Sequence, residues 1–266
     1  MPDKPLTQDF HVNKLLLLLI ALLLVASCKD KPAKPVLPDD AAPVAVVMDA
    51  RPVKMTQHKE RPQHFAFLTA AKDSLLFSDI KGAGESLSWV ANPDEETPHP
   101  EAWKTLVEGQ KAIAAEAEGS ESVLLLSTTV AKLGRTCGEC HQKLDVTPNV
   151  AVKEPKHRGL DFKDHMAGHK WALDKMWAGL ATPSEQSWVE GAKLLADAPT
   201  HLRSLSDYGD DADKAMDLAM QVHGLAADAT TETDMDARVE IFGKFLAACA
   251  YCHELPGSAP KKPPTN

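Results

Sequence analysis

The residues with the most specific chemistry in this 266-residue chain are two copies of one cysteine–histidine motif. They read Cys137-Gly138-Glu139-Cys140-His141 and Cys249-Ala250-Tyr251-Cys252-His253. In each copy, two thiols are spaced to add to the two vinyl groups along one edge of a porphyrin, and the adjacent imidazole can reach the iron. The motifs therefore predict two covalently attached c-type haems, with His141 and His253 as the proximal iron ligands.

Three other chemistries use the same cysteine spacing. A thioredoxin-like redox pair begins a helix that follows a strand, whereas both pairs here are expected late in a helix. Four cysteines can bind one zinc ion, but Cys137 and Cys249 lie 112 positions apart and each pair carries its own histidine. A disulfide within each pair would suit an oxidising compartment, although it would constrain little. The repeated histidine favours haem over all three.

The fifth cysteine, Cys28, ends an apolar segment at the N-terminus. Residues 15–26 are continuously apolar and follow Lys14. Twelve residues are too few to span a bilayer, which needs about 20, but they are typical of a secretory signal. The end of the run, Leu24-Val25-Ala26-Ser27-Cys28, resembles the bacterial lipobox. We expect a signal peptide over residues 1–27 and a lipid on Cys28, against the alternative of an ordinary signal peptide.

Residues 28–57 are rich in proline, which favours an extended chain. We interpret them as a tether between the lipid and a folded body. The sequence thus predicts an exported lipoprotein, facing the periplasm or held in the outer membrane of a Gram-negative bacterium. The net charge of −9 makes nucleic acid an unsuitable partner, because phosphate binding needs a basic face.

The chain behind the tether has helical periodicity. Before the first motif, apolar residues recur at steps of three and four and lead directly to the cysteines: Val123, Leu126, Val130, Leu133, Cys137, Cys140 and Leu144. A similar stripe precedes the second motif, from Met235 to Cys252. Both motifs are therefore expected on the buried side of a helix.

Features upstream of the two motifs recur in the same order. His64 precedes Asp73 by nine residues, and His165 precedes Asp174 by nine. A Ser-Trp-Val triplet then follows at 88–90 and at 187–189. The repetition predicts an all-α fold of two tandem four-helix bundles. Their expected bounds are 58–150 and 158–256, followed by a disordered tail over residues 257–266.

The position of the motif at the end of a four-helix unit resembles the class II cytochromes c, which include cytochrome c prime. The segment Leu133–His141 is similar to the last helix of that family, whereas Phe245–His253 departs from it by lacking glycine. The resemblance implies left-handed bundles with one haem each, and a first helix that covers the distal face of the haem. The tandem arrangement and the short units depart from the family.

The sixth iron ligand decides between electron transfer and ligand binding. The candidates on the first helices are His64 in one repeat and His165, His169 or Met166 in the other. The remaining histidines have no repeat partner and are expected in solvent: His58, His99, His157, His201 and His223. Trp89 and Trp188 are expected in the core, and Asp73 and Asp174 on outer helix faces.

No repeated acid–base pair, activated nucleophile or glycine-rich phosphate loop is visible, so the sequence favours an electron carrier over an enzyme. We expect a dihaem cytochrome that exchanges single electrons with redox partner proteins. The alternative is a five-coordinate haem protein that binds nitric oxide or carbon monoxide, or that reacts with peroxide.

Overall fold

The computed structural model describes residues 61–93, 100–146, 162–197 and 206–256, with positions 148, 150 and 152–154. All of them belong to one compact unit, Lys54–Asn266. Their regular secondary structure is entirely helical, which confirms the all-α prediction. None of the described helices is both long and apolar enough to cross a membrane. The following predicted features lie outside the described residues: the signal peptide, Cys28, the tether, the tail, His58, His99, His157 and His201.

Among the described residues, each predicted repeat has four α-helices. The first has α2 (Arg61–Leu76), α3 (Ile80–Ala91), α4 (Glu101–Ala115) and α5 (Val123–Lys143). The second has α6 (Phe162–Ala181), α7 (Glu185–Ala196), α9 (Ala212–Ala229) and α10 (Met235–Glu254), with a short 3-10 helix, η2 (Ser206–Asp211), before α9. Both motif helices begin at a capping side chain, since Ser122 accepts a hydrogen bond from Leu125 N–H and Asp234 accepts one from Ala237 N–H.

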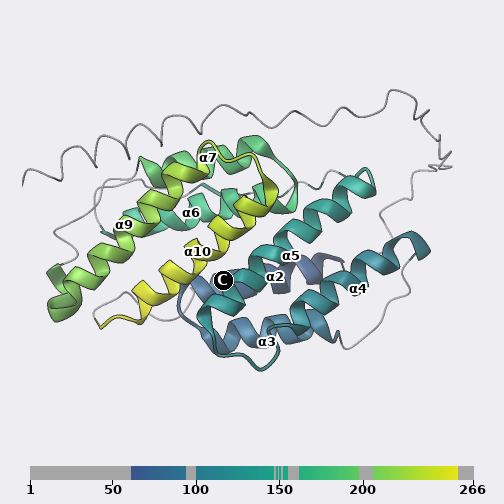
Figure 1. Ribbon diagram of the computed structural model, residues 1–266, viewed down its shortest axis with the longest axis horizontal. Coiled ribbons are helices and arrows are strands. Elements are labelled where there is room, and N and C mark those ends of the chain that lie inside the picture. The colour runs from purple at the N-terminus through teal and green to yellow at the C-terminus, as the bar shows by residue number, and fades with distance from the viewer. Residues whose placement is uncertain are drawn as a thin grey trace, which may run out of the picture. The chain divides into compact units, whose positions relative to one another are not determined.

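Helices that are consecutive within a repeat pack against each other, and the two repeats also contact each other extensively. The largest contact between repeats joins α5 to α10, the two motif helices. In addition, α5 packs on α6, and α10 packs on α2. Each motif helix therefore contacts the first helix of the other repeat. Figure 1 shows the two motif helices, the teal α5 and the yellow α10, side by side.

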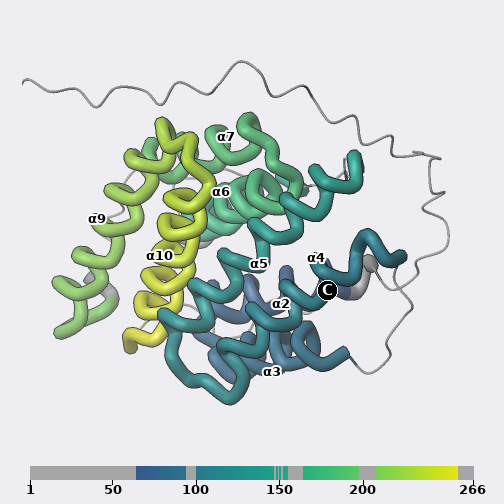
Figure 2. The backbone as a smooth tube through the Cα atoms, turned by 45° about the vertical axis from the view of Figure 1, so that its right-hand side comes forward, coloured from purple at the N-terminus to yellow at the C-terminus, as the bar shows by residue number. Residues whose placement is uncertain are grey.

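The two motif helices run antiparallel. Arg135 forms an ion pair with Asp236, and a side chain at Gly243 would approach the backbone of Thr128. In Figure 2, α10 lies between α9 and α5. Counting from the Arg135–Asp236 pair, Cys249 of α10 is level with a position on the α5 side that is about 15 residues before Cys137. The two cysteines are therefore offset by roughly 22 Å along the helix axis. The two motifs thus lie toward opposite ends of the α5–α10 pair.

The largest apolar cluster of the described residues runs through both repeats. Trp177 of α6 is 2% exposed and lies at its centre. Its ring stacks with Phe65 of the first repeat at 6.5 Å and with Phe242 of the second at 5.9 Å. Gly134 of α5 leaves no room for a Cβ beside the same indole. Residues of both repeats therefore pack around the same side chain, and this packing stabilises the two repeats together.

The prediction that Asp73 and Asp174 lie on outer helix faces is wrong. Asp174 of α6 accepts a hydrogen bond from Lys72 of α2 at 2.6 Å, and Lys170 bonds to the same carboxylate at 2.8 Å. The acidic residues at equivalent repeat positions meet between the repeats. The apolar stripe could not reveal this, because helical periodicity does not identify the neighbouring helix.

Candidate functional site

The first motif occupies the last two turns of α5. Leu126, Val130 and Leu133 are fully buried, as the predicted stripe requires, whereas Cys137 and Cys140 are half-buried. The apolar stripe therefore leaves the core at the cysteines, where a large group can be attached.

His141 is oriented by the other repeat. Its Nδ1 lies 2.7 Å from the carbonyl oxygen of Ala181, at the end of α6. Since a carbonyl oxygen only accepts, Nδ1 donates, and Nε2 carries the lone pair of the neutral ring. Histidines that bind metals commonly donate their other ring N–H to a backbone carbonyl in this way. The ring is thus held in the tautomer that an iron ligand needs.

Gly138 permits this close approach. A Cβ at this position would clash with the carbonyl oxygen of Leu180, in the last turn of α6, and with the ring of Pro183, in the α6–α7 connection. Glycine between the two cysteines therefore lets α5 lie directly against the chain segment that holds His141.

The second motif contacts the other repeat in a corresponding way. The His253 ring lies 5.9 Å from the ring of Phe77, which follows α2. Ala250, at the position of Gly138, is buried in a cluster that includes Val123 and the partly exposed Ile80 at the start of α3. Each motif is therefore packed against the turn after the first helix of the other repeat.

Burial lowers the pKa of His253, because a charged imidazole is disfavoured away from water. The ring is neutral at neutral pH, which is the form that can bind a metal ion. The two proximal candidates are thus influenced in different ways. A hydrogen bond orients His141, whereas burial favours the neutral form of His253.

Three of the four motif thiols have raised pKa values, which does not suit thiolate chemistry. Burial, assisted by the neighbouring motif cysteine, raises the pKa of Cys137 to about 12 and that of Cys249 to about 12. Burial also raises the pKa of Cys252. Reactive cysteine pairs have lowered pKa values, so the thioredoxin-like alternative is not supported. None of the four motif cysteines is disulfide-bonded in the structure.

The zinc alternative is also unsupported. Within the described residues, no group of three or more histidine, cysteine or acidic side chains is arranged to hold a metal ion. The antiparallel packing of α5 and α10 explains this for the cysteines, because it separates the two pairs along the helices.

The surroundings of the cysteines differ between the motifs. Gln110 of α4 lies with its Nε2 3.8 Å from the Cys137 sulfur. The hydroxyl of Tyr208, in η2, lies 3.9 Å from the Cys252 sulfur. At Cys249, the positive charge of Lys72 acts to lower the thiol pKa and partly offsets the increase that burial causes.

The candidate distal histidines lie at the beginning of α2 and α6. His64 is half-buried, with its ring 5.3 Å from that of Trp89 in an edge-on arrangement. Its neighbour Phe65 contacts Trp177, the indole that Gly134 also approaches. The start of α2 and the last turns of α5 therefore meet around one side chain.

In the second repeat, three histidines lie together. The rings of His165 and His169 are 4.1 Å apart, and those of His169 and His223 are 6.3 Å apart. The expectation that His223 is solvated is wrong, since it is half-buried and packs edge-on against His169. The repeat pattern did not indicate the burial of His223, because this residue lies on α9 and has no counterpart in the first repeat.

The two repeated tryptophans differ in their surroundings. Trp188 is fully buried, donates a hydrogen bond from Nε1 to the carbonyl of Ala229 at 2.9 Å, and confirms the prediction of core packing. Trp89 is only half-buried and stacks on Phe67 at 4.0 Å, beside His64. Sequence reasoning missed Trp177, because it has no tryptophan partner in the first repeat.

Comparison with known proteins identifies no relative. The chain matches no protein-family model, and neither curated proteins nor solved structures give a significant match.

Proposed function

We propose that the chain is a dihaem c-type cytochrome, made of two tandem four-helix units, that transfers single electrons at the cell envelope. The observation that carries this proposal is the pairing of two complete Cys-x-x-Cys-His motifs with equivalent helix ends. The orientation of His141 supports it, since the hydrogen bond to Ala181 leaves Nε2 available as a ligand.

The residues at both motifs fit a covalently held haem. Cys137 and Cys140 would carry one group and Cys249 and Cys252 the other, because all four are half-buried and none is oxidised to a disulfide. His141 and His253 would be the proximal ligands. When bound, haem supplies an iron that changes its charge by one electron without a change in its covalent attachment.

The chain itself performs three tasks around such a group. The Ala181 carbonyl fixes the orientation of His141, and burial keeps His253 neutral. The shared core around Trp177 holds the two motif helices in a fixed relation, since Phe65 and Phe242 stack on the same ring. A rigid environment favours electron exchange, because less rearrangement accompanies the change in charge.

We propose His64 as the sixth ligand of the first site and His169 or His165 as that of the second. The directions of the helices support the assignment in the second site, because His169 is level with Cys249 along the helices. Trp177 stacks on Phe242, and α6 runs parallel to α5, as the Trp177–Gly134 and Ala181–His141 contacts indicate. Since α5 is antiparallel to α10, α6 is antiparallel to α10 as well. His169 lies two turns before Trp177 on α6, and Cys249 lies two turns after Phe242 on α10, so His169 and Cys249 are at the same level along the two helices.

We also propose that the chain is exported and lipidated on Cys28, and that its partners are redox proteins at the membrane surface. The lipobox-like sequence and the proline-rich tether support this placement. The net charge of −9 suits partners with basic surfaces, because complementary charge speeds encounter.

The test is to mature the full chain in a host that carries a c-type haem assembly system. Intact mass should show two added haems that survive denaturation, and pyridine haemochrome spectra should give two haems per chain. A wild-type chain with no covalent haem would overturn the proposal. Full carbon monoxide binding at both sites would instead favour the gas-binding alternative.

A further inference from the structure

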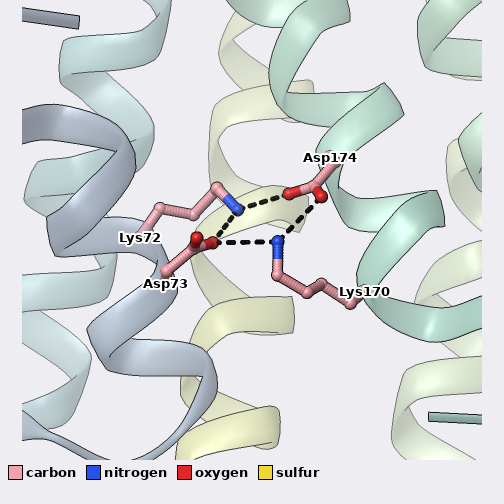
Figure 3. A network of polar contacts seen from close by, with 4 residues as sticks. All are labelled: Lys72, Asp73, Lys170 and Asp174. Atoms are coloured by element: carbon pink, nitrogen blue, oxygen red, sulfur yellow. Dashed lines mark hydrogen bonds and ion pairs between the residues drawn. The ribbon is translucent and has the colours of Figure 1, made fainter. Parts of the chain in front are cut away.

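The most unusual charged group in the described residues is Lys72, whose side chain has 0% exposure. Its ammonium lies 2.6 Å from Asp174 of α6 and is also paired with Asp73 of its own helix. Lys170 closes the network, at 2.8 Å from Asp174 and 3.4 Å from Asp73. Figure 3 shows the four side chains pointing toward one another between α2 and α6.

The network favours the charged form of Lys170. Burial of an ammonium group is costly unless carboxylates compensate it. For Lys170, burial acts to lower the pKa, but the charges and hydrogen bonds of Asp174 and Asp73 outweigh it and raise the pKa. The four groups together are close to neutral, so the loss of any one of them leaves a net charge inside the protein.

The network lies beside the second motif. The ribbon of α10 passes behind the four side chains in Figure 3, and α2 packs directly on α10. Further along the same pair of helices, the ring of Phe77, which follows α2, lies 5.9 Å from that of His253 of α10. The charge of Lys72 acts on the Cys249 thiol, which places the ammonium within electrostatic range of the position where haem would be attached.

Among the described residues, the first motif has no corresponding buried ammonium, since its nearby cation, Arg135, is half-buried and paired with Glu139 and Asp236. The repeat that aligns Asp73 with Asp174 aligns Lys72 with Leu173, an apolar side chain that is 2% exposed. The polar side chain next to Cys137 is the neutral Gln110. The acidic pair is therefore common to both repeats, whereas the buried ammonium is specific to the side that faces Cys249.

We propose that Lys72 makes the two haem sites unequal, so that the site of Cys249, Cys252 and His253 has the higher midpoint potential and is reduced first. This inference rests on the proposed function, because it requires a haem at each motif. It adds a direction to that function, since a single electron delivered to the chain occupies the second site.

The physical reason is the sign of the charge. Reduction by one electron, supplied by dithionite in a titration or by a donor protein in the cell envelope, makes the site more negative by one unit. A nearby ammonium stabilises that added charge, and the low effective dielectric of a buried site strengthens the interaction. The carboxylates weaken this effect, but Lys72 is the member of the network whose charge acts on Cys249.

The experiment is a spectroelectrochemical titration of the haem-loaded chain. Each substitution is made in the full chain and in a chain with Cys137→Ala and Cys140→Ala, where only the second site carries haem. Lys72→Leu introduces the residue found in the other repeat and should lower the second-site potential. Asp174→Asn should raise it. Lys244→Leu is the matched control, because it removes the same charge from an exposed ion pair on α10.

The outcomes separate the two claims. If the wild type carries no haem, the proposed function fails and this inference fails with it. If two haems are present but Lys72→Leu shifts the second-site potential no more than Lys244→Leu does, this inference alone is overturned. Should Lys72→Leu fail to fold, the Asp174→Asn shift decides, and an unchanged or lowered potential in that variant contradicts the role of the network.

Discussion

The two repeats use the same order of helices to build two different surroundings for one motif. In the first, His141 is oriented by a backbone carbonyl, and the neighbouring Cys137 faces an amide. In the second, His253 is kept neutral by burial, and Cys249 lies near a buried ammonium. Duplication of a helical unit therefore does not duplicate the site, because each motif is completed by residues of the other repeat.

The largest effect is expected from removing one motif at a time. Cys137→Ala with Cys140→Ala should leave one covalent haem per chain, and Cys249→Ala with Cys252→Ala should do the same for the other site. Each motif holds its own pair of thiols, so the losses should be independent. Intact mass measures this directly, and a chain that loses both haems from one double substitution would contradict the separation of the sites.

Substitution of the proposed distal ligands tests whether the two haem irons differ in coordination. His64→Ala should convert the first haem to high spin and create a carbon monoxide binding site there, since removal of a ligand opens a coordination position. His169→Ala should have a weaker effect on the second haem if His165, whose ring is 4.1 Å away, can replace it. Optical spectra with and without carbon monoxide measure both effects.

Matched controls separate ligation from packing in that comparison. Trp89→Leu removes the ring beside His64 without removing the imidazole, so it should leave the first haem six-coordinate. A wild-type protein that already binds carbon monoxide at the first site would contradict the role of His64.

The residue between the two cysteines distinguishes the repeats by packing. Gly138→Ala should lower the free energy of unfolding by about 1–3 kcal/mol, because the new Cβ meets the Leu180 carbonyl and α5 must shift. Ala250→Gly should cost about 1 kcal/mol, which is the ordinary penalty for glycine in a helix. Urea unfolding compares the two variants, and equal losses would show that the approach at Gly138 is not tight.

The smallest effect is a pH dependence that both repeats share. In the haem-free chain, burial raises the pKa of Cys137 to about 12 and that of Cys249 to about 12, whereas unfolded thiols ionise near about 8.5. The folded chain then binds more protons than the unfolded chain above that pH, so the free energy of unfolding falls as pH rises.

At pH 9, each thiol should contribute a loss of less than about 1 kcal/mol. Urea titrations at pH 7.5 and pH 9 measure the loss, which Cys249→Ala should reduce. In the haem-loaded chain the sulfurs are thioethers and have no proton to lose, so an equal loss there would contradict thiol titration as its cause.

Much of the local structure could be predicted from the sequence, because it depends on residues that are close along the chain. The stripe from Val123 to Leu133 is buried as its spacing requires, and both motif helices end at their cysteine–histidine segments. Thiols and an imidazole at this fixed spacing also indicate c-type haem without reference to any neighbour. The recurring histidine, acidic and tryptophan positions led to the prediction of two four-helix units, whereas the described residues belong to one compact unit with an apolar cluster that spans both halves.

Only the tertiary structure decided which helices face each other. The apolar stripe on α5 indicates that one side of the helix is buried. It does not indicate that α10 and α6 cover that side, because an apolar face packs against any complementary apolar face. The hydrogen bond from His141 to Ala181, the position of Trp177 and the burial of Lys72 all follow from that choice. They join residues from different repeats, and such long-range contacts leave no periodic signal in the sequence.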